Sequence, residues 1–305
     1  MDKLIIEGGR PLAGLVRVSG AKNSVLPILA ATILAEGPVQ LRNVPELRDV
    51  STMAKLLEEM GAVTSSAEEY KVDASSLSSF RAPYELVKTM RASFLVLGPL
   101  LTKYGKAEVS LPGGCAIGAR PVNLHIKGLE AMGAKIQVES GYVKAKAPQG
   151  LKGAEIFLEI ASVGATENLI MAAVLAEGKT VIHNAAQEPE ITDLISFLVK
   201  MGAKISGAGT SVVEIEGVRS LRSISHSIIG DRVEAGTFLI AGAALGGEIE
   251  VQGFDPNHLT VVLEKLKMSG ANLEISQDSV KLGMSLSRPV SYTHLRAHET
   301  DSYLV

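Results

Sequence analysis

The chain has 305 residues, of which 46% are apolar and 4% aromatic, and 30 Lys and Arg against 33 Asp and Glu leave a formal charge of -3. This composition supplies a large core, which we expect to be divided between two domains. The balanced charge disfavours a surface for nucleic acid. One cysteine makes an intramolecular disulfide impossible, and the start "MDKLIIEGG" lacks a signal-peptide pattern, so we expect a cytoplasmic protein.

The longest apolar stretches are short. They run from Val25 to Ala35 and from Leu169 to Ala176. A membrane-spanning helix needs about 20 consecutive apolar residues. The sequence therefore predicts no transmembrane segment and no membrane partner.

An internal repeat organises the chain. The phrase "MGA" occurs at Gly61, Gly133 and Gly202, and a variant, "MSGA", occurs at Gly270, so the copies recur at intervals of about 70 residues. A strand-like run and then an amphipathic helical pattern precede most copies, and another strand-like run follows. Each helix is expected to end at its glycine. The repeat predicts β-α-β units and an α/β (α+β) fold.

Polar residues stand near the predicted starts of two of these helices. We expect one helix to begin behind Asp49, and another to begin behind Thr192 and Asp193. If three units close into one domain, the first three, from about residue 22 to 229, form a complete domain. The fourth unit then begins a second domain.

The lone thiol lies in an unusual setting, "LPGGCAIGAR". Three glycines around Cys115 favour a mobile loop, and the nearby Arg120 favours the thiolate. Such a thiol can act as a nucleophile or a proton donor, although a single cysteine is more often a small buried apolar residue.

Two further cations stand out. Lys22 opens an apolar helical pattern after a glycine-containing turn, where its ammonium and the free amide groups of the helix could bind an anion. Arg91 precedes a nearly uninterrupted apolar run. A structural ion pair and an anion-binding role both remain open for Arg91.

Several motifs taken together resemble one enzyme family. They are "GAKNSVLP", "MRASFLVLGPLL", "LPGGCAIGARPVNLH", "SVGATEN", "EPEITDL" and "DRVEAGTF". From Met1 to about Pro289 the chain resembles the UDP-N-acetylglucosamine enolpyruvyl transferases, which act first in peptidoglycan precursor synthesis. The resemblance implies an inside-out α/β barrel with three repeats in each domain. It divides the chain into residues 22–229, a first domain, and residues 1–21 plus 230–289, an incomplete second domain.

The resemblance also implies a reaction. The 3-hydroxyl of UDP-N-acetylglucosamine attacks C2 of phosphoenolpyruvate, C3 takes a proton, and phosphate leaves, with no metal or organic cofactor. Lys22 and Cys115 would be catalytic. Cys115 would be the lid thiol that protonates C3 and that phosphoenolpyruvate or fosfomycin can trap as an adduct. Lys22, Arg91 and Arg120 would clamp the phosphate and the sugar nucleotide, and Asn23 would hold the reacting hydroxyl region.

The remaining site residues are assigned by the same resemblance. Contacts to the uridine diphosphate would come from Arg120, Pro121, Val122, Asn123 and Leu124, and from Ser162, Val163 and Gly164. Glu188, Asp231 and Arg232 would be supporting charges.

The resemblance stops at about Val290. The family's "PTDMQ" motif and a later arginine are not found, and we expect residues 290–305, which end "SYTHLRAHETDSYLV", to be a non-native tail. We therefore expect this chain to be poorly active. His294, His298 and Glu299 imitate a metal site, but an unrelated tail explains them better, and no metal is predicted. The histidines elsewhere are expected to be ordinary surface or packed residues: His125, His183, His226 and His258.

Two other interpretations remain open. One is the shikimate-pathway enolpyruvyl transferase, which shares the fold and the reaction type but uses another acceptor. The other is a non-catalytic protein that keeps only sugar-nucleotide binding. The sequence does not fix the oligomeric state.

Overall fold

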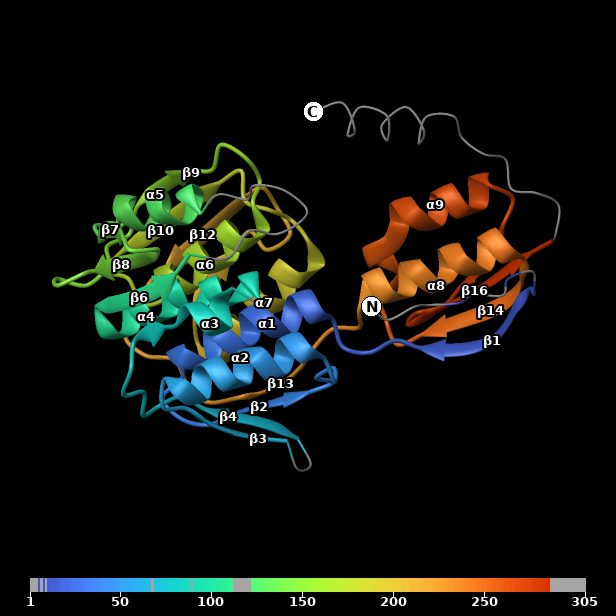
Figure 1. Ribbon diagram of the computed structural model, residues 1–305. Coiled ribbons are helices and arrows are strands. Elements are labelled where there is room, and N and C mark those ends of the chain that lie inside the picture. The colour runs from blue at the N-terminus through green and yellow to red at the C-terminus, as the bar shows by residue number, and fades with distance from the viewer. Residues whose placement is uncertain are drawn as a thin grey trace. The chain divides into compact units, whose positions relative to one another are not determined.

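The computed structural model describes residues 5, 8, 10–66, 69–88, 90–111 and 122–285. These residues form two compact units (Figure 1): a larger one, Gly20–Ile229, and a smaller one drawn from Met1–Ser19 and Gly230–Val305. In the described part of the chain, no helix is long and apolar enough to cross a membrane. The same residues contain no group of three His, Cys, Asp or Glu side chains that could hold a metal ion.

Three four-stranded sheets form the outside of the larger unit. The strands of the first lie in the order β13 (Ser225–Ser227), β2 (Val39–Arg42), β4 (Tyr70–Asp73), β3 (Val63–Ser65). The second is β5 (Arg81–Ala82), β6 (Lys106–Ser110), β8 (Tyr142–Lys146), β7 (Lys135–Glu139). The third is β9 (Glu155–Phe157), β10 (Lys179–His183), β12 (Val212–Glu216), β11 (Lys204–Ser206). In every sheet the first pair is parallel and the other pairs are antiparallel.

Helices fill the space between the sheets (Figure 1). The innermost are α1 (Lys22–Ala31), α4 (Leu97–Tyr104) and α6 (Val163–Ala173), and their apolar residues are almost all buried. A helix that is apolar on every side is stable only when it is enclosed. The amphipathic helices α2 (Arg48–Glu59), α5 (Asn123–Ala131) and α7 (Pro189–Met201), the short helix α3 (Tyr84–Val87) and the 3-10 turns η1 (Thr32–Leu34) and η2 (Arg91–Val96) complete the unit.

The glycines of the repeat end their helices as predicted. Gly61, Gly133, Gly202 and Gly270 have φ angles of 106°, 92°, 112° and 97°, a left-handed conformation in which other residues are strained. After each glycine the chain forms a hairpin of two strands, and its second strand lies next to the first strand of the unit. Each repeat therefore contains one more strand than the predicted β-α-β pattern. This additional strand runs antiparallel to its neighbours, so each sheet contains both parallel and antiparallel pairs.

Both predicted helix starts are wrong. Helix α2 begins at Arg48, so Asp49 lies in its first turn, where a carboxylate is favourable to the helix dipole. Helix α7 begins at Pro189, whose fixed φ suits the first position of a helix. Asp193 lies inside α7 because its carboxylate is used elsewhere in the core, as described below.

The smaller unit contains one sheet of the same kind and two helices. Its strands lie in the order β1 (Leu12–Arg17), β14 (Gly247–Gln252), β16 (Ser279–Met284), β15 (Asn272–Ile275). Helices α8 (Arg232–Leu245) and α9 (Thr260–Met268), with the turn η3 (Pro256–Leu259), cover one face of the sheet (Figure 1).

Two of the sheets pair strands that lie far apart in the sequence. In chain order β1 precedes α1, yet it pairs with β14 of the smaller unit. Strand β13 precedes α8, yet it pairs with β2 of the larger unit. These two sheets are thereby completed by a strand that is distant from its partner in the sequence.

Candidate functional site

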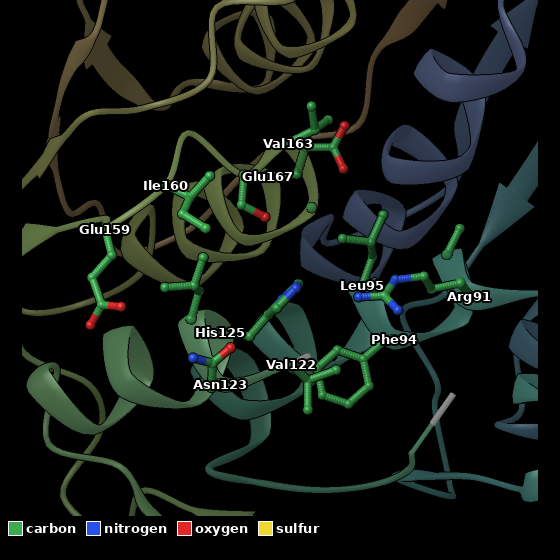
Figure 2. A pocket seen from close by; sticks show the side chains of 14 residues that line it. Arg91, Phe94, Leu95, Val122, Asn123, His125, Glu159, Ile160, Val163 and Glu167 are labelled. Atoms are coloured by element: carbon green, nitrogen blue, oxygen red, sulfur yellow. The ribbon is translucent and has the colours of Figure 1, made fainter. Parts of the chain in front are cut away.

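A cavity of about 540 Å³ opens in the larger unit (Figure 2). Its wall is built by η2, by the first turn of α5 and by the segment that leads into α6. The lining residues are Arg91, Ala92, Phe94, Leu95, Val122, Asn123, Leu124, His125, Glu159, Ile160, Ser162, Val163, Gly164 and Glu167.

The cavity brings together seven residues that the sequence predicts for substrate binding. They are Arg91, Val122, Asn123, Leu124, Ser162, Val163 and Gly164. They come from three separate stretches of the chain, and the packing of α5 against α6 and of α6 against η2 places these stretches side by side.

The start of α6 forms one side of the cavity and suits an anion. Ser162 is the N-cap residue, and its Oγ accepts a hydrogen bond from the Ala165 amide at 3.4 Å. The first turn contains no acidic residue, and the leading amide groups of any helix have no partner within it. Figure 2 shows the guanidinium of Arg91 turned into the same cavity.

His125 also lines this cavity, and it is only 6% exposed. Its ring stands edge-on to that of Phe94, with centroids 5.1 Å apart. Burial, and then the positive charge of Arg91, lower the pKa of His125 to about 4. The ring is therefore neutral at pH 7.

Glu167 has the opposite shift. Its side chain is 3% exposed, and burial, followed by the charges of Glu190 and Glu188, raises the pKa of this carboxyl well above its usual value. The neutral form of Glu167 is favoured, so this wall carries less negative charge than its sequence indicates.

Lys22 and Asn23 lie in the same unit but do not line the cavity. Both are in the first turn of α1, where Lys22 Nζ is 3.6 Å from Asp49 Oδ2 and Asn23 is exposed. Helix α1 packs against η2, the turn that carries Arg91. Glu188 is the N-cap residue of α7.

The predicted supporting residues Asp231 and Arg232 belong to the smaller unit, at the start of α8. Asp231 Oδ1 accepts hydrogen bonds from the amides of Val233 (2.8 Å) and Glu234 (3.1 Å). Asp231 therefore caps α8, a structural role that does not depend on a substrate.

Three predicted site residues, Cys115, Arg120 and Pro121, lie outside the described residues. The same is true of His294, His298 and Glu299, whose spacing imitates a metal site. Their assignments stay predictions.

The motifs in the sequence did not indicate that His125 and Glu167 belong to the cavity. His125 directly follows the "PVNL" run, and Glu167 is a charged residue inside the apolar α6 segment. A charge in an apolar segment indicates a special environment, and this signal was available for Glu167.

Comparisons with known proteins identify the family. Residues 6–297 match the family model of EPSP synthase (3-phosphoshikimate 1-carboxyvinyltransferase). A UDP-N-acetylglucosamine 1-carboxyvinyltransferase of Saccharophagus degradans is 54% identical over 291 residues, which are 95% of this chain and 69% of the relative. One of the same name from Shewanella amazonensis is 57% identical over 290 residues, with the same coverage.

Solved structures show the same fold. The enolpyruvyl transferase NikO of Streptomyces tendae has a TM-score of 0.79 at 23% identity, over 92% of this chain and 68% of that one. EPSP synthase of Acinetobacter baumannii has a TM-score of 0.69 at 22% identity, over 91% and 65%. These structures confirm the predicted fold class. The two relatives that are 54% and 57% identical to this chain identify the family within that fold. The chain belongs to the family of UDP-N-acetylglucosamine 1-carboxyvinyltransferases.

Proposed function

We propose that this chain transfers the enolpyruvyl group of phosphoenolpyruvate to the 3-hydroxyl of UDP-N-acetylglucosamine, with release of phosphate, at the low rate expected from its sequence. The relatives above 50% identity carry the name of this activity. The observation that supports it best is the cavity, because one wall combines Arg91 with the two runs 122–124 and 162–164. A cytoplasmic location and a role in cell-wall synthesis, and hence in cell shape and division, belong to the same proposal.

The cavity would hold the nucleotide. The run 122–124 lies at the start of α5 and would contact the uridine, since Val122 and Leu124 offer apolar surface. The diphosphate would lie at the N-terminus of α6, where free amide groups and the positive end of the helix dipole stabilise anions. Arg91 would add a full positive charge to this end of the cavity.

The chemistry would take place beside this nucleotide. Lys22 and Arg120 would stabilise the negative charge that develops during addition, Asn23 would hold the reacting hydroxyl, and Cys115 would give its proton to C3. Glu188, Asp231 and Arg232 would support the site. Within this proposal Cys115 is the group that fosfomycin alkylates, so a Cys115→Ser chain should show no mass increase on incubation with fosfomycin.

Calorimetric titration tests the binding step. The chain is expected to bind UDP-N-acetylglucosamine and to show no binding of shikimate 3-phosphate. Arg91→Met should weaken binding about tenfold or more, because one charge-assisted contact is lost. The matched control is Arg81→Met, since Arg81 is exposed and pairs with Glu108 away from the cavity.

Phosphate release from phosphoenolpyruvate plus UDP-N-acetylglucosamine tests the transfer. Preference for shikimate 3-phosphate, or equal binding by the Arg91→Met and Arg81→Met chains, contradicts the proposed site. Tight binding of UDP-N-acetylglucosamine without phosphate release supports the non-catalytic alternative instead.

A further inference from the structure

The hydrogen-bond partner of His125 fixes the chemical form of its ring. Helix α6 places Asn168 behind the ring, with its Nδ2 3.0 Å from His125 Nδ1. The other end of the Asn168 amide is fixed as well, because its Oδ1 accepts a hydrogen bond from the Gly98 amide at 2.7 Å. Only the NH2 group of Asn168 is then left to face the imidazole.

The consequence concerns the tautomer of His125. An NH2 group donates, so Nδ1 of His125 must accept and cannot carry a hydrogen. In a neutral ring the hydrogen therefore lies on Nε2. Asn168 also reaches the Phe94 carbonyl oxygen at 3.4 Å with the same Nδ2, which holds the amide in this orientation.

The Nε2 edge of the ring faces the start of α6. A Cβ added to Gly164 would lie 3.6 Å from His125 Nε2, so the absent side chain leaves this edge open. No hydrogen-bond partner of Nε2 is found among the described residues. The Nε2 N–H of His125 thus faces the start of α6, where the diphosphate is proposed to lie (Figure 2).

We infer that His125 is a ligand-binding residue, that it donates one hydrogen bond from Nε2 to a phosphoryl oxygen of the nucleotide, and that Asn168 is the positioning residue that fixes its tautomer. This inference rests on the proposed function, since it needs a nucleotide in the cavity. An uncharged donor keeps its strength over the working pH range, which a surface histidine would not do.

The tautomer is tested on the wild-type chain, without a ligand. Nitrogen-15 histidine NMR at pH 7 should show His125 with hydrogen on Nε2 alone. The Asn168→Asp chain should move the hydrogen to Nδ1 or protonate both nitrogens, because a carboxylate accepts where the amide donated. Hydrogen on Nδ1 in the wild-type chain overturns the inference.

The ligand contact is tested by two substitutions and a control, with UDP as the probe. His125→Asn keeps an acceptor for Asn168 but loses the group at the Nε2 position, so UDP binding should fall about tenfold, as expected for one buried hydrogen bond. His125→Gln places an amide N–H near the Nε2 position and should restore most of the affinity. His183→Asn is the control, because His183 pairs with Glu155 and does not line the cavity.

A pH series separates a neutral donor from a charged one. The charged and titratable groups that line the cavity with His125 are Arg91 on η2, Glu159 before α6 and Glu167 on α6. They are common to the wild-type and His125→Gln chains, so their effects cancel in the ratio of the two UDP affinities. A ratio that is constant from pH 5.5 to 8 supports the neutral donor, and a ratio that rises as pH falls contradicts it.

The failure of the inference differs from that of the proposed function. Wild-type chain that binds no UDP overturns the proposed function and, with it, the ligand contact. Wild-type and His125→Asn chains that bind UDP equally overturn only the inference about His125. Circular dichroism of each variant confirms that it is folded, and the NMR measurement decides the tautomer even if a variant is not.

Discussion

At the scale of single residues, the cavity wall holds two buried titratable groups with opposite shifts. The pKa of His125 is lowered and that of Glu167 is raised, and burial is the main cause of both. Burial disfavours whichever form is charged, so an acid and a base shift in opposite directions. The stability of the larger unit should therefore decrease as pH falls, because of His125, and also as pH rises, because of Glu167.

Glu167 gives the first prediction. In the unfolded chain this carboxyl ionises above its usual pKa, whereas in the folded chain it keeps its proton to a much higher pH. The free energy of unfolding should therefore fall as pH rises through the range between the two values. In the Glu167→Gln chain the free energy of unfolding, measured with urea at pH 5 and pH 8, should no longer decrease for this reason. If the difference in free energy between the two pH values is the same as in the wild-type chain, the raised pKa of Glu167 is contradicted.

His125 gives the second prediction, on the acid side. Its folded pKa of about 4 lies below the ordinary value of 6.5, so the unfolded chain takes up the proton first as pH falls. The contribution of the neutral His125 ring to the free energy of unfolding is fully present above pH 6.5 and is lost as pH falls toward 4. The total loss is about 3 kcal/mol. Urea unfolding of the His125→Gln chain should show a flatter acid limb, whereas the His183→Asn control should follow the wild-type chain.

A buried carboxylate next to the proposed catalytic turn gives the third prediction. Asp193 accepts hydrogen bonds from Ser24 Oγ (2.5 Å), His226 Nε2 (2.9 Å) and the Ile229 amide (3.4 Å). Ser24 directly follows Lys22 and Asn23 in α1. Asp193→Ala would leave these donors buried without an acceptor, which should cost about 3 kcal/mol or more in the free energy of unfolding.

The control for Asp193 is Asp73→Ala. The Asp73 carboxylate accepts hydrogen bonds from the amide and the hydroxyl of Ser75, which is exposed, so this change should cost less than about 1 kcal/mol. Equal losses in the two chains, measured by chemical denaturation, would show that the buried network contributes nothing special.

At the scale of elements, α4 and α6 approach closely because one position on α4 has no side chain. A Cβ at Gly98 would overlap both the side-chain and main-chain oxygens of Asn168. The Gly98 amide also donates to that side-chain oxygen. The contact therefore sets both the helix spacing and the orientation of Asn168, and through it the ring of His125.

Gly98→Ala is the fourth prediction. It should destabilise the chain by about 2 to 3 kcal/mol, the usual result of overpacking, and should weaken UDP binding because Asn168 moves. The matched control is Gly236→Ala in α8, where the nearest atom to the added methyl is Leu259 Cδ2 at 3.6 Å. A thermal melt should leave that control near the wild-type value, and a Gly98→Ala chain of wild-type stability would contradict the packing argument.

The ends of the helices could be predicted, and their starts could not. The ends depend on a local property, the ease with which Gly61, Gly133 and Gly202 adopt a left-handed conformation. The predicted starts relied on the preference of polar side chains for the N-cap position. At Asp193 this preference does not apply, because the carboxylate accepts hydrogen bonds from Ser24 and His226 in the core of the larger unit. A side chain bonded inside the core is no longer free to cap a helix.

At the scale of the whole molecule, each unit has a core of its own. The larger core includes Leu198 and the smaller one Leu239, and both side chains are fully buried. Helices α8 and α9 of the smaller unit also expose apolar residues: Val233, Phe238, Ile240, Leu245, Val261 and Met268.

The separate cores give the fifth prediction, which scanning calorimetry can test. The chain should unfold in two transitions, and UDP should raise only that of the larger unit, because a ligand stabilises the unit that binds it. Leu198→Ala should lower one transition and Leu239→Ala the other, each by the equivalent of about 2 to 5 kcal/mol. A single transition that both substitutions shift would mean that the units unfold together.

The sequence by itself determined the repeat, the fold class and the family, because glycine caps, apolar periodicity and contiguous motifs are properties of short segments. It also indicated Arg91 and the runs 122–124 and 162–164 as binding residues. Only the tertiary structure decided that these segments share one cavity, that β1 pairs with β14 and β13 with β2, and that Asn168 orients His125. These features join residues far apart in the chain, and burial, which sets the charge of His125 and Glu167, exists only once the helices have packed.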